Sequence, residues 1–342
     1  MGRLIWGLGL FALAVACFPE AVRASDWDAC KGTSPDMAIF GCSAIINAGT
    51  DTQENVAGAY RNRGGAYFDK GDYDRAIKDF DKSIALNPNE AVPYAYRGSA
   101  YHNKGDYDRA IKDFDEAIVL NPKDGQFHRN RGSAYHNKRD YDRAIKDFDK
   151  AIALNPKDGE SYGSRGDAYR IKGDYDRAIK DFDKAIVLNP KDGQSYRIRG
   201  DAYLYKGDYD RAIKDLDKAI ALNPKNAHTY RLRGHAYFSK GEYDLAIKDF
   251  DEGIDLDPKY TFVYYLRCIA YVEKRTYDRA IKDCNRVIAL DPKFAGAFYY
   301  RGKSYEKLGS KTEAKSEYQK ALSLAPTYKD AVEGLKRLKS AP

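Results

Sequence analysis

The side chains best suited to catalysis or metal binding are few in this chain, and their spacing fits neither role. The 342 residues include five histidines, none in a His-Glu-x-x-His arrangement or at a cysteine–histidine ligand spacing. His102 and His136 occupy the same position of two neighbouring sequence copies, and packed helices would hold them roughly 10 Å apart, too far to share one metal ion. Phosphate-binding glycine loops, nucleophile elbows and paired acid sites are also missing. We therefore predict that the protein is not an enzyme and holds no metal ion and no cofactor.

The most regular feature of the charged residues is a series of arginines. An arginine recurs at a constant interval in eight sequence copies, and in seven of them an aspartate follows it at a constant distance, as Asp113 follows Arg97. The arginines are Arg63, Arg97, Arg131, Arg165, Arg199, Arg233, Arg267 and Arg301. A guanidinium can pair with a carboxylate through two parallel hydrogen bonds. We therefore expect a ladder of arginine–aspartate pairs along the molecule, with a structural role rather than a binding role.

The arginine series belongs to a longer pattern with the same period. Every copy also has a tyrosine, an alanine and a proline at constant positions after the arginine, and in the second copy these are Tyr101, Ala110 and Pro122. A fixed period of this length indicates stacked structural repeats. The pattern resembles the tetratricopeptide repeat, although the arginine replaces the leucine that is usual in that family. The resemblance covers residues 57–328.

The resemblance implies an all-α fold, a right-handed superhelical solenoid of eight helix-turn-helix repeats. The expected repeats are 57–90, 91–124, 125–158, 159–192, 193–226, 227–260, 261–294 and 295–328. Apolar residues recur at helical spacing within each repeat. A glycine such as Gly71 and a capping aspartate such as Asp72 would separate the two helices. An Asn-Pro pair then ends the second helix in most repeats.

The segments on either side of the repeats are predicted to cap the solenoid. Residues 25–56 are expected to form a degenerate repeat, with a short helix near 26–31 and a polar loop over 49–54. Residues 329–342 are expected to form a capping helix and a tail, with Val332 and Leu335 facing the last repeat. Such caps cover the open ends of a solenoid.

Residues 1–24 are typical of a secretory signal peptide. Arg3 gives a basic start, residues 4–18 are apolar, and small residues precede a cleavage point after Ala24. We therefore predict an exported, periplasmic protein that keeps no membrane span after cleavage. Two alternatives stay open, a retained membrane anchor and a lipid attached to Cys17.

The four cysteines of the predicted mature chain fall into two pairs. In the seventh repeat, Cys268 and Cys284 replace a glycine and an aromatic residue expected to face each other across the two helices. Cys30 and Cys42 would join the two helices of the N-terminal cap. An exported protein can keep disulfides, so we predict both bonds. Two buried free thiols are the alternative for Cys268 and Cys284.

By family resemblance, the second, fifth, ninth and twelfth positions of each first helix line a concave groove. The candidate contact residues are Arg129, Arg197, Arg231, Phe238, Phe262, Tyr265, Ile269 and Val272. We expect an extended peptide whose acidic part binds Arg129 and Arg197 and whose apolar part binds near Phe262 and Tyr265. The carboxylate clamp of chaperone-binding relatives is not expected, because its groove asparagine is missing. Alternatively, the arginines are only solvated and the apolar residues pack within the chain or against a second copy.

These patterns predict a protein interaction scaffold, an adaptor in the cell envelope that binds a protein or an extended peptide. The alternative is a docking subunit of an envelope enzyme or of a secretion or assembly complex. Nucleic acid is not an expected partner, because the net charge of +7 is mild and acidic residues interleave with the basic ones.

Overall fold

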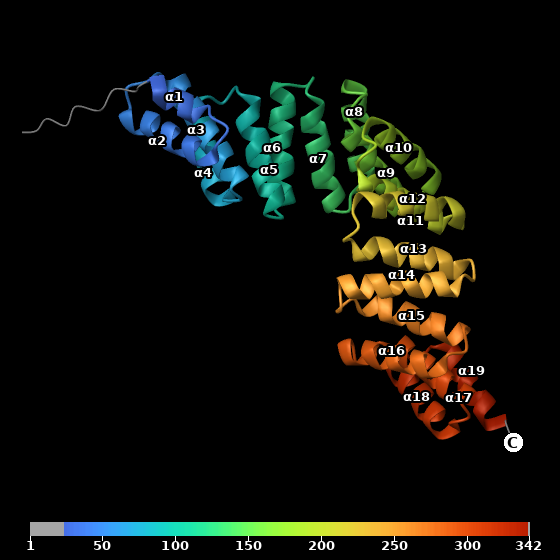
Figure 1. The fold of residues 1–342 in the computed structure, drawn as a ribbon. Helices are drawn as coiled ribbons and strands as arrows, with labels where there is room; N and C mark the ends of the chain where they lie inside the picture. The colour runs from blue at the N-terminus through green and yellow to red at the C-terminus, as the bar shows by residue number, and fades with distance from the viewer. Residues whose placement is uncertain (1–23, 341–342) are drawn as a thin grey trace, which may run out of the picture. The chain divides into compact units, whose positions relative to one another are not determined.

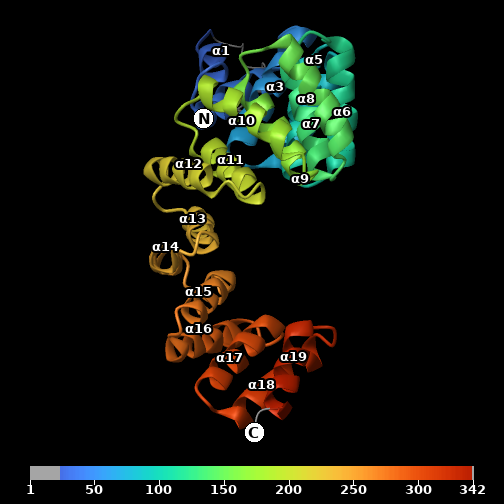
Figure 2. The same ribbon diagram turned by 90° about the vertical axis from the view of Figure 1, so that its right-hand side faces the viewer.

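The computed structural model describes residues 24–340. These residues form nineteen helices and no strand (Figures 1 and 2). No helix among them is long and apolar enough to cross a membrane. Apart from Ala24, which begins the first helix, the predicted signal peptide and Cys17 lie outside the described residues.

The chain divides into two compact units, which meet between Leu154 and Asn155. The first unit contains α1 (Ala24–Cys30), α2 (Pro35–Ala48), α3 (Gln53–Asp69), α4 (Tyr73–Leu86), α5 (Ala91–Asn103), α6 (Tyr107–Leu120), α7 (Gly125–Asn137) and α8 (Tyr141–Leu154). The second contains α9 (Gly159–Ile171), α10 (Tyr175–Leu188), α11 (Gly193–Tyr205), α12 (Tyr209–Leu222), α13 (Ala227–Ser239), α14 (Tyr243–Leu256), α15 (Thr261–Glu273), α16 (Tyr277–Leu290), α17 (Ala295–Lys307), α18 (Lys311–Leu324) and α19 (Lys329–Ser340). Within each unit, successive helices pack in pairs, which confirms the predicted all-α array.

In most repeats, the two helices pack closely where a glycine of the first helix faces an aromatic ring of the second. In the second repeat, a Cβ atom at Gly98 would lie 3.0 Å from the ring of Phe114. Phe114 is 1% exposed, and Ala110 beside it is fully buried. Because a larger residue at either small position would push the helices apart, the regular spacing of these residues along the chain follows from packing.

The turn between the paired helices follows the predicted chemistry. Gly105 adopts a left-handed conformation with φ of 79°, and the Asp106 side chain then accepts a hydrogen bond from the Arg109 backbone N–H. In the third and seventh repeats, Arg139 and Arg275 occupy the same position with φ of 63° and 59°. The turn therefore keeps its conformation even where the glycine is missing.

The structure confirms the predicted arginine ladder. In addition to the predicted pair within a repeat, the arginine binds a residue of the preceding repeat. Arg97 donates two hydrogen bonds to Asp113 of its own repeat, from Nε at 2.9 Å and Nη2 at 2.7 Å. Its Nη1 donates a third, 2.6 Å long, to Asp81 of the preceding repeat. Burial alone would lower the pKa of Arg97, but the two carboxylates outweigh it and raise that pKa above its ordinary value.

The same geometry recurs along both units. The pairs within a repeat are Arg63–Asp79, Arg97–Asp113, Arg131–Asp147, Arg165–Asp181, Arg199–Asp215, Arg233–Asp249, Arg267–Asp283 and Arg301–Glu317. At the ends of the array the bond to the preceding repeat goes to neutral groups, Ser43 in the cap and Asn285 before the last repeat. The cap is therefore in register with the repeats.

The segments on either side of the repeats depart from the prediction in two details. In the N-terminal cap, α3 begins at Gln53, so the loop before it is shorter than predicted. In α19, Ala331 is fully buried and Leu335 packs into the last core, but Val332 is 36% exposed. The prediction for Val332 was wrong because α19 docks through Gly334, where a Cβ atom would lie 2.6 Å from Tyr318.

Both predicted cysteine pairs lie at disulfide distance. The Cα atoms of Cys30 and Cys42 are 4.6 Å apart, and those of Cys268 and Cys284 are 5.8 Å apart. Both values fall in the range of protein disulfides. Each pair joins the two helices of one structural unit, α1 with α2 and α15 with α16.

We predict that Arg199→Ala lowers the free energy of unfolding of the fifth repeat by about 3 kcal/mol, because it leaves a buried carboxylate unpaired. Asp215, its partner, is only 5% exposed. Hydrogen exchange in α11 and α12 should report the loss locally. Arg177→Ala is the matched control, because that arginine is 59% exposed and its ion pair is with Asp174 at the start of α10. Equal exchange in the two variants would contradict a structural role for the ladder.

The second prediction is that both cysteine pairs are oxidised in protein purified from its native host. Peptide mapping without reductant should find Cys30 joined to Cys42 and Cys268 joined to Cys284. Each bond closes a short loop, which stabilises a fold by about 3 kcal/mol. Cys30→Ser should therefore speed hydrogen exchange over residues 26–48 and leave the central repeats unchanged, since repeat contacts are local. Free thiols in the peptide map would show that the pairs are only neighbours.

Candidate functional site

The predicted groove residues are divided between the two units. Arg129 lies on α7 of the first unit, whereas Arg197, Arg231, Phe262 and Tyr265 lie on α11, α13 and α15 of the second. Within the second unit, the first helices of neighbouring repeats contact one another, α9 with α11, α11 with α13 and α13 with α15. The site is therefore built from the second unit alone.

Polar contacts place the ninth and twelfth positions of neighbouring first helices side by side. Arg170, at the twelfth position of α9, donates from Nη2 to Asp167 at 2.8 Å. Its Nη1 donates to Asp201, at the ninth position of α11, at 3.2 Å. Burial raises the pKa of Asp201, while Arg170 and two other arginines oppose that rise. A charged cluster thus crosses from one repeat to the next on the face that the sequence predicted.

Arg197 is the member of this cluster that has no partner. It is half-buried, and it forms no hydrogen bond or ion pair with any residue that the structure describes. Burial lowers the pKa of Arg197, Asp201 opposes this, and the charges of Arg170 and Arg231 add to the lowering. The guanidinium is therefore half-buried, with the charges of Asp201 and Asp167 near it but with no hydrogen bond to either.

Arg231 stands beside Arg197 and is only partly satisfied. Its Nη2 lies 3.4 Å from Nε2 of His228, and its Nε is buried without a hydrogen-bond partner. Burial, followed by the charge of Arg231, lowers the pKa of His228 to about 4, so that imidazole is neutral at physiological pH. Three arginines and two aspartates therefore leave the cluster with one net positive charge.

An apolar surface adjoins the arginines on the next helix. The Phe262 ring is 41% exposed, and the Arg231 guanidinium lies 5.9 Å from its centroid. Tyr265 is more enclosed, with its ring 4.7 Å from that of Phe294 and 5.7 Å from that of Tyr300. Burial raises the pKa of Tyr265 above its ordinary value. Phe262 is therefore the exposed aromatic of this pair, whereas Tyr265 packs mainly within the chain.

The other predicted apolar contacts differ in accessibility. Phe238 and Ile269 are half-buried, and the Phe238 ring lies 5.4 Å from that of Tyr243. Val272 is only 4% exposed and packs in the core with Cys268 and Cys284. This corrects the assignment of Val272 to the groove, because a ligand cannot reach its side chain while the core is intact.

Three residues of the cluster were not among the predicted contacts. Arg170 occupies the twelfth position of its repeat, and Asp167 and Asp201 occupy the ninth. The positional rule that selected Arg197 could therefore have selected them as well. Opposite charges at adjoining groove positions were the available signal. No group of histidine, cysteine or acidic residues able to hold a metal ion occurs among the residues that the structure describes.

Helix pairs stacked in register, with variable side chains on their first helices, define an α-helical repeat protein of the interaction-scaffold class. Family models described as tetratricopeptide repeat match residues 57–90, 80–112, 97–158, 137–193, 227–260 and 295–328, and one described as TPR repeat matches 200–241. The chain belongs to the tetratricopeptide repeat family, whose members generally bind other proteins. No curated protein matches the chain.

Solved structures agree on the fold. The chain resembles one chain of the crystal structure of the APC/C hetero-tetramer Cut9-Hcn1, at 17% identity and a TM-score of 0.57, covering 92% of this chain and 66% of that one. It also resembles a tetratricopeptide repeat protein from Parabacteroides merdae, at 21% identity and a TM-score of 0.55, with 73% of this chain and 99% of that one covered. The Pseudomonas aeruginosa protein pilF matches at 17% identity and a TM-score of 0.55, over 60% of this chain and 94% of that one.

Proposed function

We propose that the protein is a non-catalytic adaptor that binds an extended segment of a partner protein through the first helices of its second unit. The observation that carries the proposal is Arg197, a half-buried guanidinium without a partner among the described residues. Arg197 is not part of the arginine ladder that joins the repeats. The arginines of that ladder all have carboxylate partners, so the fold itself does not explain why Arg197 is there. A ligand anion would supply the missing hydrogen-bond partner.

The net charge of the arginine–aspartate cluster indicates how much negative charge the ligand carries. The three arginines and two aspartates together have one net positive charge, which matches a single carboxylate. Phe262 lies against Arg231, so an apolar side chain of the same ligand can pack beside the acid. The ligand is therefore an extended peptide with an acidic residue followed within a few residues by an apolar one. Arg129 stays a secondary candidate, on the first unit.

The location proposed for this adaptor is the cell envelope. Residues 1–24 support it, as do the two cysteine pairs at disulfide distance, since disulfides persist in oxidising compartments. A docking subunit of an envelope complex is the second candidate, because one of the similar chains comes from the structure of a hetero-tetramer. Gel filtration of a native envelope extract separates the two, since a subunit would run with a stable complex and an adaptor would not.

We expect acidic peptides to bind through Arg197 and Phe262. The probes are pools of capped heptapeptides whose central residue is fixed as Glu, Ala or Arg, titrated against the chain from Ser25 onward. The Glu pool should bind best, Arg197→Gln should weaken it about tenfold, or about 1.4 kcal/mol, and Phe262→Ala should cost more than about 1 kcal/mol. Arg177→Gln, on a second helix, is the control and should change nothing. Equal binding of the Glu and Ala pools would reject the proposal.

The export prediction is tested by intact mass. Protein from the native host should begin at Ser25, because the cleavage pattern ends at Ala24. A retained Met1 would contradict export by this leader, and a lipid mass on Cys17 would show a lipoprotein instead.

A further inference from the structure

The net charge of the chain is concentrated in residues 275–342. This stretch contains 15 lysines and arginines and 8 aspartates and glutamates, and its net charge of +7 equals that of all 342 residues. Residues 1–274 are therefore neutral overall. A concentration of one sign of charge attracts partners of the opposite sign, so we examined how the basic side chains of this stretch are arranged.

Four of these basic side chains form a row along the second helix of the seventh repeat. The row consists of Arg275, in the turn before α16, and of Arg279, Lys282 and Arg286 on α16 itself. The steps between them are four, three and four residues, which is the spacing of one helix face. All four side chains are exposed. We call this set the basic row.

No member of the basic row pairs with a carboxylate of the described residues. In five other repeats, the arginine equivalent to Arg279 forms an ion pair with the aspartate that caps its helix, as Arg177 does with Asp174. In the seventh repeat this aspartate is replaced by Thr276, whose hydroxyl donates instead to the Tyr271 carbonyl at 3.1 Å. Arg279 thus has the position of these arginines without their partner.

The backbone of Arg275 also departs from the usual repeat. Its φ is 59°, in the left-handed region, and six other repeats have a glycine at this position. A residue with a side chain is less stable in this conformation by about 1 kcal/mol. Because Arg275 is exposed and unpaired, packing does not explain why its side chain is there. Strained residues of this kind cluster at functional sites.

The acidic residues of α16 do not balance the basic row. Residues 275–288 contain four basic and two acidic residues, whereas the equivalent residues 173–186 of the fourth repeat contain three basic and four acidic ones. Of the two acids in the seventh repeat, Asp283 is buried and binds Arg267 of the ladder. Asp278 is the exposed one. The row and Asp278 together therefore have a net charge of +3.

The neighbouring helix α14 limits the shape of a partner. The two helices lie side by side (Figures 1 and 2), because Arg267 donates to Asp251 of α14 and to Asp283 of α16. Glu252 and Asp255 of α14 are exposed acids. A broad anionic surface, such as a membrane or a nucleic acid duplex, would meet these acids as well as the row. The row therefore favours a narrow partner that lies along α16.

An exposed apolar side chain stands beside the row. Leu245 on α14 is 45% exposed and occupies the position that Arg279 has in the next repeat. Asp244, next to Leu245, pairs with Lys274, which is next to Arg275. The start of α14 therefore adjoins the start of the row. A leucine in this place favours a protein segment with an apolar side chain over a ligand that offers phosphate groups alone.

We propose that the basic row and Leu245 dock an acidic amphipathic helix of a partner protein. Carboxylates spaced by four, three and four residues on that helix would meet the four cations, and an apolar residue on its adjoining face would contact Leu245. The row belongs to a second helix and shares no residue with the site on the first helices. This proposal therefore does not depend on the function proposed above.

The test uses a capped, alanine-based helical peptide of about 18 residues. It carries four glutamates at the spacing of the row and a leucine beside them, and a second peptide has glutamine in place of each glutamate. Fluorescence anisotropy measures the affinity of each for the chain from Ser25 onward. The Glu peptide should bind about tenfold more tightly than the Gln peptide, as expected for four exposed ion pairs together. Equal affinity of the two peptides would overturn the proposal.

Two substitutions that restore the residues of other repeats give the second arm. Arg275→Gly relieves the strained turn, and Thr276→Asp supplies Arg279 with its usual partner, so the double variant should unfold at no lower temperature. It should nevertheless remove the difference between the Glu and Gln peptides. Arg139→Gly makes the same change in the third repeat and should leave that difference intact. A Glu preference that survives the double variant would contradict the proposal, as would one that Arg139→Gly also removes.

Two further measurements separate this surface from other anionic partners and from the first-helix site. Arg197→Gln should leave the Glu preference unchanged, so the two proposals can fail separately. Vesicles of phosphatidylglycerol and duplex DNA are titrated in parallel and should bind the double variant as they bind the unaltered protein. Vesicle or DNA binding that exceeds binding of the Glu peptide and is lost in the double variant would overturn the assignment of a protein helix.

Discussion

The array of repeats depends on the hydrogen bonds that the guanidinium of the recurring arginine donates to carboxylates of its own repeat and of the preceding one. Arg97 uses separate nitrogen atoms to bind Asp113 in its own helix pair and Asp81 in the preceding pair. Apolar packing is not directional and would tolerate small slips between neighbouring pairs. A planar fork with fixed donors tolerates much less, and an ammonium group could not replace it, because it acts as a point charge. The ladder therefore sets the register in which the apolar surfaces meet.

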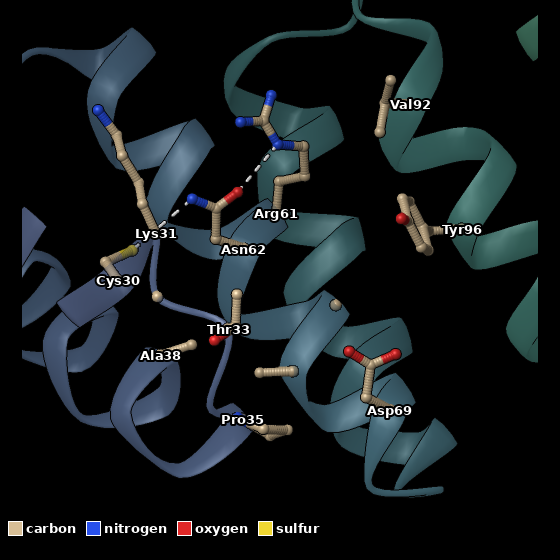
Figure 3. A pocket seen from close by; sticks show the side chains of 13 residues that line it. Cys30, Lys31, Thr33, Pro35, Ala38, Arg61, Asn62, Asp69, Val92 and Tyr96 are labelled. Atoms are coloured by element: carbon tan, nitrogen blue, oxygen red, sulfur yellow. Dashed lines mark hydrogen bonds between the residues drawn. The ribbon is translucent and has the colours of Figure 1, made fainter. Parts of the chain in front are cut away.

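A scaffold fixed in this way leaves the first-helix positions free to vary. In the second unit these positions carry arginines beside an exposed phenylalanine, and Arg197 forms no hydrogen bond or ion pair with the described residues. In the first unit the equivalent positions of α3 include Gly58 and Gly65, which line two neighbouring pockets, and Figure 3 shows the pocket at Gly65. The helix pairs beneath the two surfaces are nearly the same. Differences in binding chemistry thus require no change in the fold.

The fold could be predicted because each packing constraint is repeated eight times along the sequence. The helix pairs, the turn glycines, the ladder and the cysteine proximity all follow from columns of equivalent positions. Val332 and Val272 were misplaced because hydrophobicity alone does not show which apolar residue faces a core. The orientation of α19 is set by Gly334 against Tyr318, and a glycine gives no apolar signal. Arg197 has no hydrogen-bond partner because Asp201 binds Arg170 instead. Which of the two arginines binds Asp201 depends on the three-dimensional arrangement of the helices and could not be predicted from the sequence.

The near identity of the repeats has a consequence for how the gene can change. Residues 141–152 and 175–186 have the same sequence, YDRAIKDFDKAI. A recombination event that adds or removes one whole central repeat would keep the ladder in register, because the arginine and its aspartate partners recur at the same positions in neighbouring central repeats. Insertions of any other length would break the ladder. Natural alleles of this gene should therefore differ in length by whole repeats, and the number of binding surfaces should change with them.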